Sequence, residues 1–301
     1  MEKGLISKPM KKVFASNYIG DTLCSYVVMR RHSKEMDSGL IAWSHGVLSK
    51  YFTVVTSTAS PAVNDAREQF RCCLDQMGQP DPTSLSLRDR LLRSSEPASE
   101  RSSPTEGTAL RVPFKRSGNP LRIDIDGLHE LAIRRRSVRW YLAKPISRKI
   151  IDRAVQIAAE SPSACNRQPY FFRVFDNPEL AQRLGSIPMG TKGFSHQFPV
   201  FIVIVGKLGA YPFSRDRHAI YVDASLAAMA LQLSLEAQGV SSCSINWPDI
   251  PSKNREMAEA LRLADDERIV MCMSAGYSDP EALIPFSQKK PVDELRSYNQ
   301  L

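Results

Sequence analysis

From residue 121 onward, apolar positions follow helical and strand spacings in alternation. The helical spacing predicts helices over 127–137, 148–160, 220–239 and 252–263, and Asn177 followed by Pro178 predicts the start of another. Short apolar runs bounded by breaking residues predict strands at 170–175, 199–206, 241–247 and 267–277. This order predicts an α+β fold. The chain has no GxGxxG motif and too few βαβ units for a dinucleotide-binding Rossmann domain.

The first 120 residues have a different character. Residues 1–80 carry long runs of mixed polarity and are predicted to be a helical N-terminal region. Residues 81–120 are rich in Ser, Pro and Arg, a composition that buries too little apolar surface to fold alone. We therefore expect three parts: the helical region, a linker or wrapping arm, and a folded domain over 121–301.

Several classes of protein have little support in the sequence. The chain contains no phosphate-binding P-loop, GxSxG elbow, HExxH motif or CxxC pair, so hydrolases and metal sites are disfavoured. No apolar run approaches the roughly 18–20 residues that span a bilayer, and the N-terminus lacks the apolar core of a secretory signal. We expect a cytoplasmic protein without a membrane partner, in which Cys165, Cys243 and Cys272 are reduced core residues.

The charge of the chain is concentrated in one short segment. Lys and Arg number 40 against 32 Asp and Glu, a net charge of +8. Between Leu131 and Ile150 there are bases and no acidic residue: Arg134, Arg135, Arg136, Arg139, Lys144, Arg148 and Lys149. Such a run can be a solvated face or a nucleic-acid surface. A hydroxyl among guanidinium groups, as in RRRSVRWY, also suits a phosphate group.

A second segment, SPSACNRQPYFF at 161–172, lies between a predicted helix and a predicted strand. It combines small hydroxyl side chains, the amides of Asn166 and Gln168, and an apolar flank. These groups equip a loop to hydrogen-bond the edge of a planar heterocycle, although an ordinary capped turn has the same composition.

Taken together, these segments resemble the FMN-dependent nitroreductase family. The resemblance extends over about 170 residues from Gly127. It is carried, in order, by RRSVRWY, SPSACNRQP, PVFIVIVG, VDASLAAMALQL, GVSSCSINW and GYSDPEALIPFSQKKPVDEL. It implies a three-layer sandwich with a central, mostly antiparallel sheet flanked by helices. It also implies an intertwined homodimer with FMN bound at the interface.

The resemblance assigns the cofactor-binding residues by position. Arg135, Arg136 and Ser137 would bind the FMN phosphate and ribityl chain, and Arg139 would lie near the N1 edge and stabilise reduced flavin. The remaining expected contacts come from three further segments and comprise Pro162, Ser163, Asn166, Gln168, Ile245, Asn246, Lys289 and Lys290. A flavin-edge residue is also expected within 186–198, where Lys192 is a candidate. No side-chain acid or base is needed, because flavin N5 carries the chemistry.

The segment YPFSRDRH falls where relatives place residues that contact the substrate. Tyr211 and Phe213 would stack on an aromatic acceptor and Arg215 would hold an anionic one, although a plain surface loop fits equally well. Asn246 and Trp247 replace the acid-glycine or glycine pair of many relatives, which predicts a narrower pocket.

The sequence therefore predicts an enzyme, an FMN-dependent NAD(P)H oxidoreductase that passes hydride to a nitroaromatic, a quinone or an activated alkene. One alternative is an FMN oxidase or dehydrogenase of an azoline-type substrate that does not use nicotinamide. Another, from a different class, is a basic module that binds nucleic acid or an acidic surface. The confinement of the charge to one segment argues against nucleic acid.

Overall fold

The computed structural model describes residues 121–300, which fall into two units. The larger unit comprises Arg122–Pro162, Pro169–Leu208 and His218–Leu301, and the smaller unit includes Ser163–Gln168 and Gly209–Arg217. The predicted helical region over 1–80 and the linker over 81–120 lie outside the described residues.

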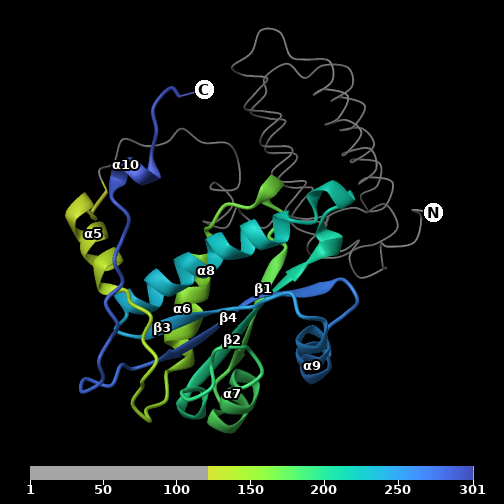
Figure 1. Cartoon of the computed structure of the whole chain (residues 1–301), viewed down its shortest axis with the longest axis horizontal. Coiled ribbons are helices and arrows are strands. Elements are labelled where there is room, and N and C mark those ends of the chain that lie inside the picture. Colours follow the sequence, from red (N-terminus) through yellow and green to blue (C-terminus); the bar gives the residue numbers. More distant parts are fainter. Residues whose placement is uncertain (1–120, 301) are drawn as a thin grey trace, which may run out of the picture. The chain divides into compact units, whose positions relative to one another are not determined.

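A four-stranded antiparallel sheet forms the middle of the larger unit (Figure 1). Its order is β1 (Tyr170–Phe175), β2 (Val200–Lys207), β4 (Glu267–Gly276) and β3 (Ser241–Asn246). The two central strands are the most apolar, because both of their faces are covered. All four strands lie where the apolar runs predicted them.

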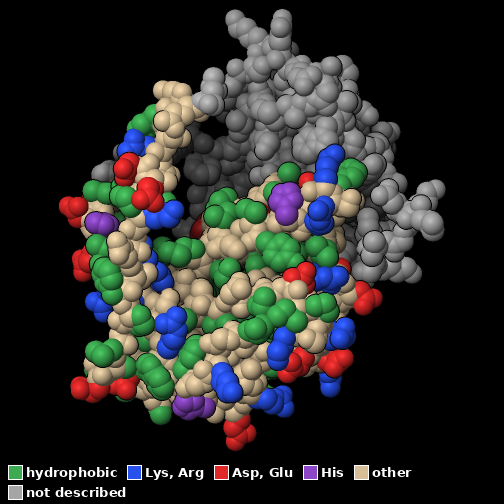
Figure 2. Space-filling model, in the orientation of Figure 1, with side chains coloured by type: hydrophobic (Ala, Val, Ile, Leu, Met, Phe, Trp, Pro, Cys, Tyr) green, Lys and Arg blue, Asp and Glu red, His purple; other side chains and the backbone are tan. Residues whose placement is uncertain are grey.

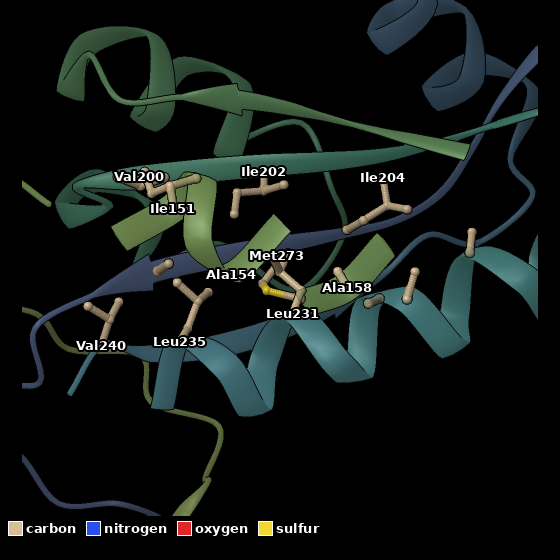
Figure 3. Packing of buried hydrophobic residues seen from close by; sticks show 14 of the residues in the cluster. Ile151, Ala154, Ala158, Val200, Ile202, Ile204, Leu231, Leu235, Val240 and Met273 are labelled. Atoms are coloured by element: carbon tan, nitrogen blue, oxygen red, sulfur yellow. The ribbon is translucent and has the colours of Figure 1, made fainter. Parts of the chain in front are cut away.

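Helices α6 (Arg148–Ala159) and α8 (Ala219–Ala237) cover one face of the sheet. Figure 3 shows the side chains of this layer packed between the two helices and the strands. The cluster includes Ile151, Ala154, Ala158, Leu231 and Leu235 from the helices, and Val200, Ile202, Ile204 and Met273 from the sheet. Small alanines let the two helices approach the strands closely.

Helices α7 (Pro178–Gly185) and α9 (Pro251–Leu261) lie on the opposite face of the sheet (Figure 1). Their buried side chains pack with the other faces of the strands in a second cluster, which includes Ala181, Leu184, Phe198, Phe201, Val203, Met257 and Cys272. The two clusters and the sheet between them form the predicted three-layer α+β sandwich.

The helix ends largely follow the predicted signals. The Asn177 side chain accepts a hydrogen bond from Leu180 N–H at 3.0 Å and caps α7, which has Pro178 in its first turn. Gly239 follows α8 with a φ of +76°. By contrast, α5 (Ile125–Arg134) ends before the remaining arginines and buries none of its residues. Its predicted apolar face is therefore largely exposed, because no described residue buries it.

Helix α8 also corrects the expectation about membrane-spanning length. Within the described residues, the helical stretch Ser214–Ala237 is long and apolar enough to cross a membrane by length and composition, although 56% of its most apolar window is buried in the protein. A helix at the centre of a core passes the same test. Polar residues such as Asp223 and Gln232 interrupt the apolar sequence of α8, so this helix contains no uninterrupted apolar run of membrane-spanning length.

Candidate functional site

The chain leaves α5 as an extended segment, Arg135–Tyr141, that runs beside the outer strand β3. Val138 N–H donates a hydrogen bond to the Ser242 carbonyl at 3.2 Å, and Ser137 forms a parallel bridge with Ser242. The arginine-rich motif is therefore joined to the edge of the sheet by an isolated β-bridge.

Two buried side chains anchor this segment in the core. Val138 and Tyr141 both belong to the cluster on the α7 and α9 side. The Tyr141 hydroxyl donates to the Val138 carbonyl at 2.6 Å and lies 2.8 Å from the Ser274 hydroxyl. Burial raises the pKa of Tyr141, so the phenol stays protonated. The Tyr141 ring lies against Gly276, where an added Cβ would come within 2.6 Å of it.

Arg135, Ser137 and Arg139 alternate along the extended segment and all lie near Cys243 of β3. Burial raises the pKa of the Cys243 thiol, whereas Arg139, a hydrogen bond with Ser137, and Arg135 partly oppose that rise. Because all three groups act on the Cys243 thiol, they lie on the same side of the segment and form one row. The structure thus brings together three of the predicted phosphate and flavin residues.

Arg135 supplies an unsatisfied donor within this row. Its Nε is buried and has no hydrogen-bond partner among the described residues. A buried donor without a partner is costly, and a bound group can supply the missing acceptor. The neighbouring Arg136 donates from Nη1 to the Arg135 carbonyl at 3.0 Å. The donor set of two guanidinium groups and a hydroxyl fits a phosphate-bearing cofactor.

The predicted heterocycle-binding loop belongs mostly to the smaller unit. There the Ser163 hydroxyl accepts a hydrogen bond from Gln168 N–H at 2.9 Å, and Gln168 Nε2 donates to Asn166 Oδ1 at 2.8 Å. Cys165, Asn166 and Gln168 have φ values of 54°, 49° and 48°, a left-handed conformation that is costly for residues other than glycine. Cys165 is exposed, so the expectation that it fills the core is wrong.

The expected substrate segment also lies in the smaller unit. The Arg167 guanidinium lies over the Tyr211 ring at 5.1 Å, and Arg167 Nη1 donates to the Ala210 carbonyl at 2.9 Å. Phe213 is exposed, with the Arg215 guanidinium 4.5 Å from its ring centroid. Of the expected substrate contacts, Phe213 and Arg215 therefore stack on each other, whereas Tyr211 is buried and stacks with Arg167, which was not predicted.

The remaining predicted contacts occupy different environments in the larger unit. Pro162 is exposed. Ile245 is buried in the core cluster with Val138, whereas Asn246 is exposed at the end of β3. Both are strand residues rather than loop residues. Trp247 follows them and donates from Nε1 to Asn254 Oδ1 at 2.7 Å.

The predicted lysines are all exposed. Lys289 Nζ donates to the Ser287 hydroxyl at 2.8 Å, and Lys290 Nζ lies 3.6 Å from a Glu294 carboxylate oxygen. Lys192 is exposed as well. In the connection that carries Lys192, the residues that reach the arginine segment are instead Phe194, whose ring lies 5.9 Å from the Arg139 guanidinium, and Gln197.

Sequence reasoning missed two further residues. Gln197 hydrogen-bonds the backbone of the arginine segment, a contact between residues far apart in sequence that no local pattern signals. Glu236, buried on α8, accepts a hydrogen bond from Arg134 Nε at 3.2 Å and holds the end of α5. A carboxylate within an otherwise apolar helix was a signal for Glu236, since buried charges are normally paired.

The antiparallel sheet between two helical layers, with a row of arginine and serine side chains at one edge, defines the class of nitroreductase-like α+β proteins. A family model described as the nitroreductase family matches residues 132–191 and 186–277. The chain belongs to this family, which is one of oxidoreductases.

Curated relatives of the chain carry a narrower name. Iodotyrosine deiodinase 1 of Pongo abelii is 20% identical over 222 residues, covering 64% of this chain and 76% of that protein. Iodotyrosine deiodinase of Haliscomenobacter hydrossis is 23% identical over 184 residues, covering 52% of this chain and 81% of that protein.

A solved structure supports the fold. The NfrA1 nitroreductase of B. subtilis has a TM-score of 0.51 and 18% identity, covering 57% of this chain and 74% of that chain. At this identity the likeness concerns the fold alone.

Proposed function

We propose that the protein is an FMN-dependent oxidoreductase that passes two electrons from NAD(P)H to an electron-poor organic acceptor. The observation that carries the proposal is the row of Arg135, Ser137 and Arg139, with the buried Nε of Arg135 lacking a partner among the described residues. Arg135, Ser137 and Arg139 would hold FMN, which when bound would supply two-electron hydride-transfer chemistry.

Each side chain of this row would have a role that follows from its position along the segment. Arg135 and Ser137 would hold the phosphate with charge-assisted hydrogen bonds, with Arg136 beside them. Arg139, two residues further along the same face, would place a fixed positive charge near the edge of the ring that becomes negative on reduction. The anchors Val138 and Tyr141 support both roles by fixing the backbone between them.

A homodimer belongs to the same proposal, and its support is the uncovered apolar surface of the larger unit. Tyr221, Val222, Leu226 and Met229 of α8 are each more than 40% exposed. Figure 2 shows hydrophobic side chains gathered over the face on which α8 lies in Figure 1. A contiguous apolar face of this kind marks an interaction surface.

The curated relatives favour a second candidate for the acceptor step. Reductive dehalogenation of a halogenated aromatic substrate would consume the same two electrons and a proton, replace a carbon–halogen bond by a carbon–hydrogen bond, and release halide. The names of the curated relatives support this reaction, because those relatives are iodotyrosine deiodinases. It would use the same flavin site.

The first test is binding of FMN to the full chain. We expect purified protein to bind FMN stoichiometrically and to turn yellow. Arg135→Ala should weaken binding at least about tenfold, because it removes a charged donor from the phosphate. Arg153→Ala, which removes an exposed arginine from α6, serves as the matched control and should bind normally. Wild-type protein that stays colourless after incubation with FMN would refute the proposal.

A second measurement separates the candidate reactions. Bleaching of the bound flavin by NADH or NADPH under anaerobic conditions supports the nicotinamide-dependent reaction, and its absence favours a specialised substrate oxidised without nicotinamide. The reduced protein is then mixed with a nitroaromatic, a quinone, an activated alkene or an iodinated phenol. The compound that restores the oxidised flavin spectrum identifies the acceptor class, and release of iodide supports dehalogenation.

A further inference from the structure

The connection between α7 and β2 meets the arginine segment at three consecutive residues. The Arg139 guanidinium lies 5.9 Å from the centroid of the Phe194 ring. The Trp140 ring makes an edge contact with His196 at 6.3 Å between centroids. Tyr141 N–H donates a hydrogen bond to Gln197 Oε1 at 3.2 Å.

The Gln197 side chain makes a second bond, which gives it a particular role. Its Nε2 donates to the Arg139 carbonyl at 2.8 Å. One primary amide therefore satisfies both an acceptor at residue 139 and a donor at residue 141, as a neighbouring strand would. Because both bonds go to the backbone, they restrict the dihedral angles on either side of Trp140. They fix the direction in which Arg139 leaves the chain.

We propose that Gln197 is a positioning residue that orients Arg139, and through it sets how strongly the site favours reduced over oxidised FMN. The inference rests on the proposed function, because it concerns the same flavin site. Gln197 acts together with Phe194, which supports the guanidinium from the same connection. Displacing Arg139 by even 1 Å would weaken its interaction with a charge that develops on the ring.

The test is the two-electron reduction potential of FMN bound to the full chain. Gln197→Met keeps much of the volume of the side chain and removes both hydrogen bonds. We expect it to weaken binding of reduced FMN about tenfold more than binding of oxidised FMN, which lowers the potential by about 30 mV. The matched control Gln182→Met, on α7, should leave the potential unchanged.

A double-mutant cycle shows whether the effect passes through Arg139. In an Arg139→Ala background, Gln197→Met should cause no additional shift in potential, because the group that it orients is gone. A potential that does not change in Gln197→Met, or a shift that persists in full in the Arg139→Ala background, would overturn the inference. A change in thermal stability with an unchanged reduction potential would also overturn the inference.

A further variant keeps the test valid if Gln197→Met does not fold. Gln197→Asn keeps a neutral primary amide but shortens the side chain by one methylene, so that one amide no longer reaches both the Arg139 carbonyl and Tyr141 N–H. It is measured in the same cycle, with the same expected absence of an additional shift in the Arg139→Ala background. Failure of the wild-type protein to bind FMN overturns both the proposed function and this inference. Normal FMN binding with an unchanged potential in the variants overturns the inference alone.

Discussion

The two basic segments assigned to the flavin site are held in very different ways. The Arg135–Tyr141 segment has core anchors in Val138 and Tyr141, a backbone bond to β3, and two bonds from Gln197. The C-terminal tail, residues 281–300, is almost entirely exposed. Just before it, Asp279 N–H donates a hydrogen bond to the Trp140 carbonyl at 3.1 Å. Beyond that point Lys289 and Lys290 contact only near neighbours among the described residues, Ser287 and Glu294.

This difference indicates which parts of the site the single chain builds for itself. The first segment is preorganised, so its cations keep their places without a ligand. The tail instead exposes large apolar side chains, with Leu283 at 92% and Phe286 at 91%. Such side chains are normally covered in the functional assembly. In the proposed function, the phosphate end of the site would therefore form within one chain, and the tail would take its place in the proposed dimer.

The largest expected effect comes from breaking the anchor of the first segment. In Gly276→Ala the new Cβ would lie 2.6 Å from two atoms of the Tyr141 ring and 2.9 Å from Pro199 Cγ. The ring cannot move freely, because its hydroxyl is bonded to Val138 and Ser274. We expect a loss of about 2–3 kcal/mol in the free energy of unfolding, measured by urea denaturation, together with weaker FMN binding.

Gly127→Ala is the matched control for that substitution. Gly127 lies in the first turn of α5, and its added Cβ would meet only side-chain atoms, the nearest being Asp124 Oδ1 at 3.2 Å. Alanine favours a helix over glycine, so stability should be unchanged or slightly higher. If Gly276→Ala were as stable as this control, the anchor would not hold the segment.

The outcome for the sheet shows what the sequence pattern determines. All four strands were predicted, and β2 most clearly, because a strand covered on both faces requires an uninterrupted apolar run and β2 is buried along nearly its whole length. The apolar stripe of α5 was predicted equally well, yet none of its residues is buried. A pattern shows that a face is apolar, but it does not show whether the same chain covers it.

The candidate site likewise contains residues that could be predicted from the sequence and residues that could not. Arg135, Ser137 and Arg139 were predicted through the family resemblance, although the helical spacing placed Arg135 and Ser137 in a helix that in fact ends at Arg134. Gln197 was not, since its bonds to the backbone join residues 58 positions apart and depend on the fold. The predicted cap of α6 shows a smaller limit: Ser147 is the N-cap residue, but its side chain makes no capping hydrogen bond.

An intermediate effect is expected from the apolar side chains of the tail. If the protein forms the proposed dimer and the tail lies at its interface, Phe286→Ser should raise the dissociation constant of that dimer about tenfold or more, because a large aromatic residue buried at an interface contributes strongly to binding. Light scattering across a dilution series measures it. Leu180→Ser, on α7 and 39% exposed, removes a surface apolar group from the opposite layer and should leave the dimer intact. Equal dimerisation of both variants would contradict the role given to the tail.

The smallest effect is expected at Lys290, and it sharpens the contrast with Arg135. Its ion pair with Glu294 spans 3.6 Å between side chains that are 68% and 55% exposed. Solvent and salt screen such a pair, so Lys290→Ala should change the free energy of unfolding by less than about 0.5 kcal/mol. FMN affinity should fall less than in Arg135→Ala, because an exposed lysine must lose side-chain freedom to reach a phosphate, whereas the Arg135 donor is already buried in place. Titrations of FMN into both variants measure this difference, and a larger loss for Lys290→Ala would mean that the tail, rather than the anchored segment, dominates phosphate binding.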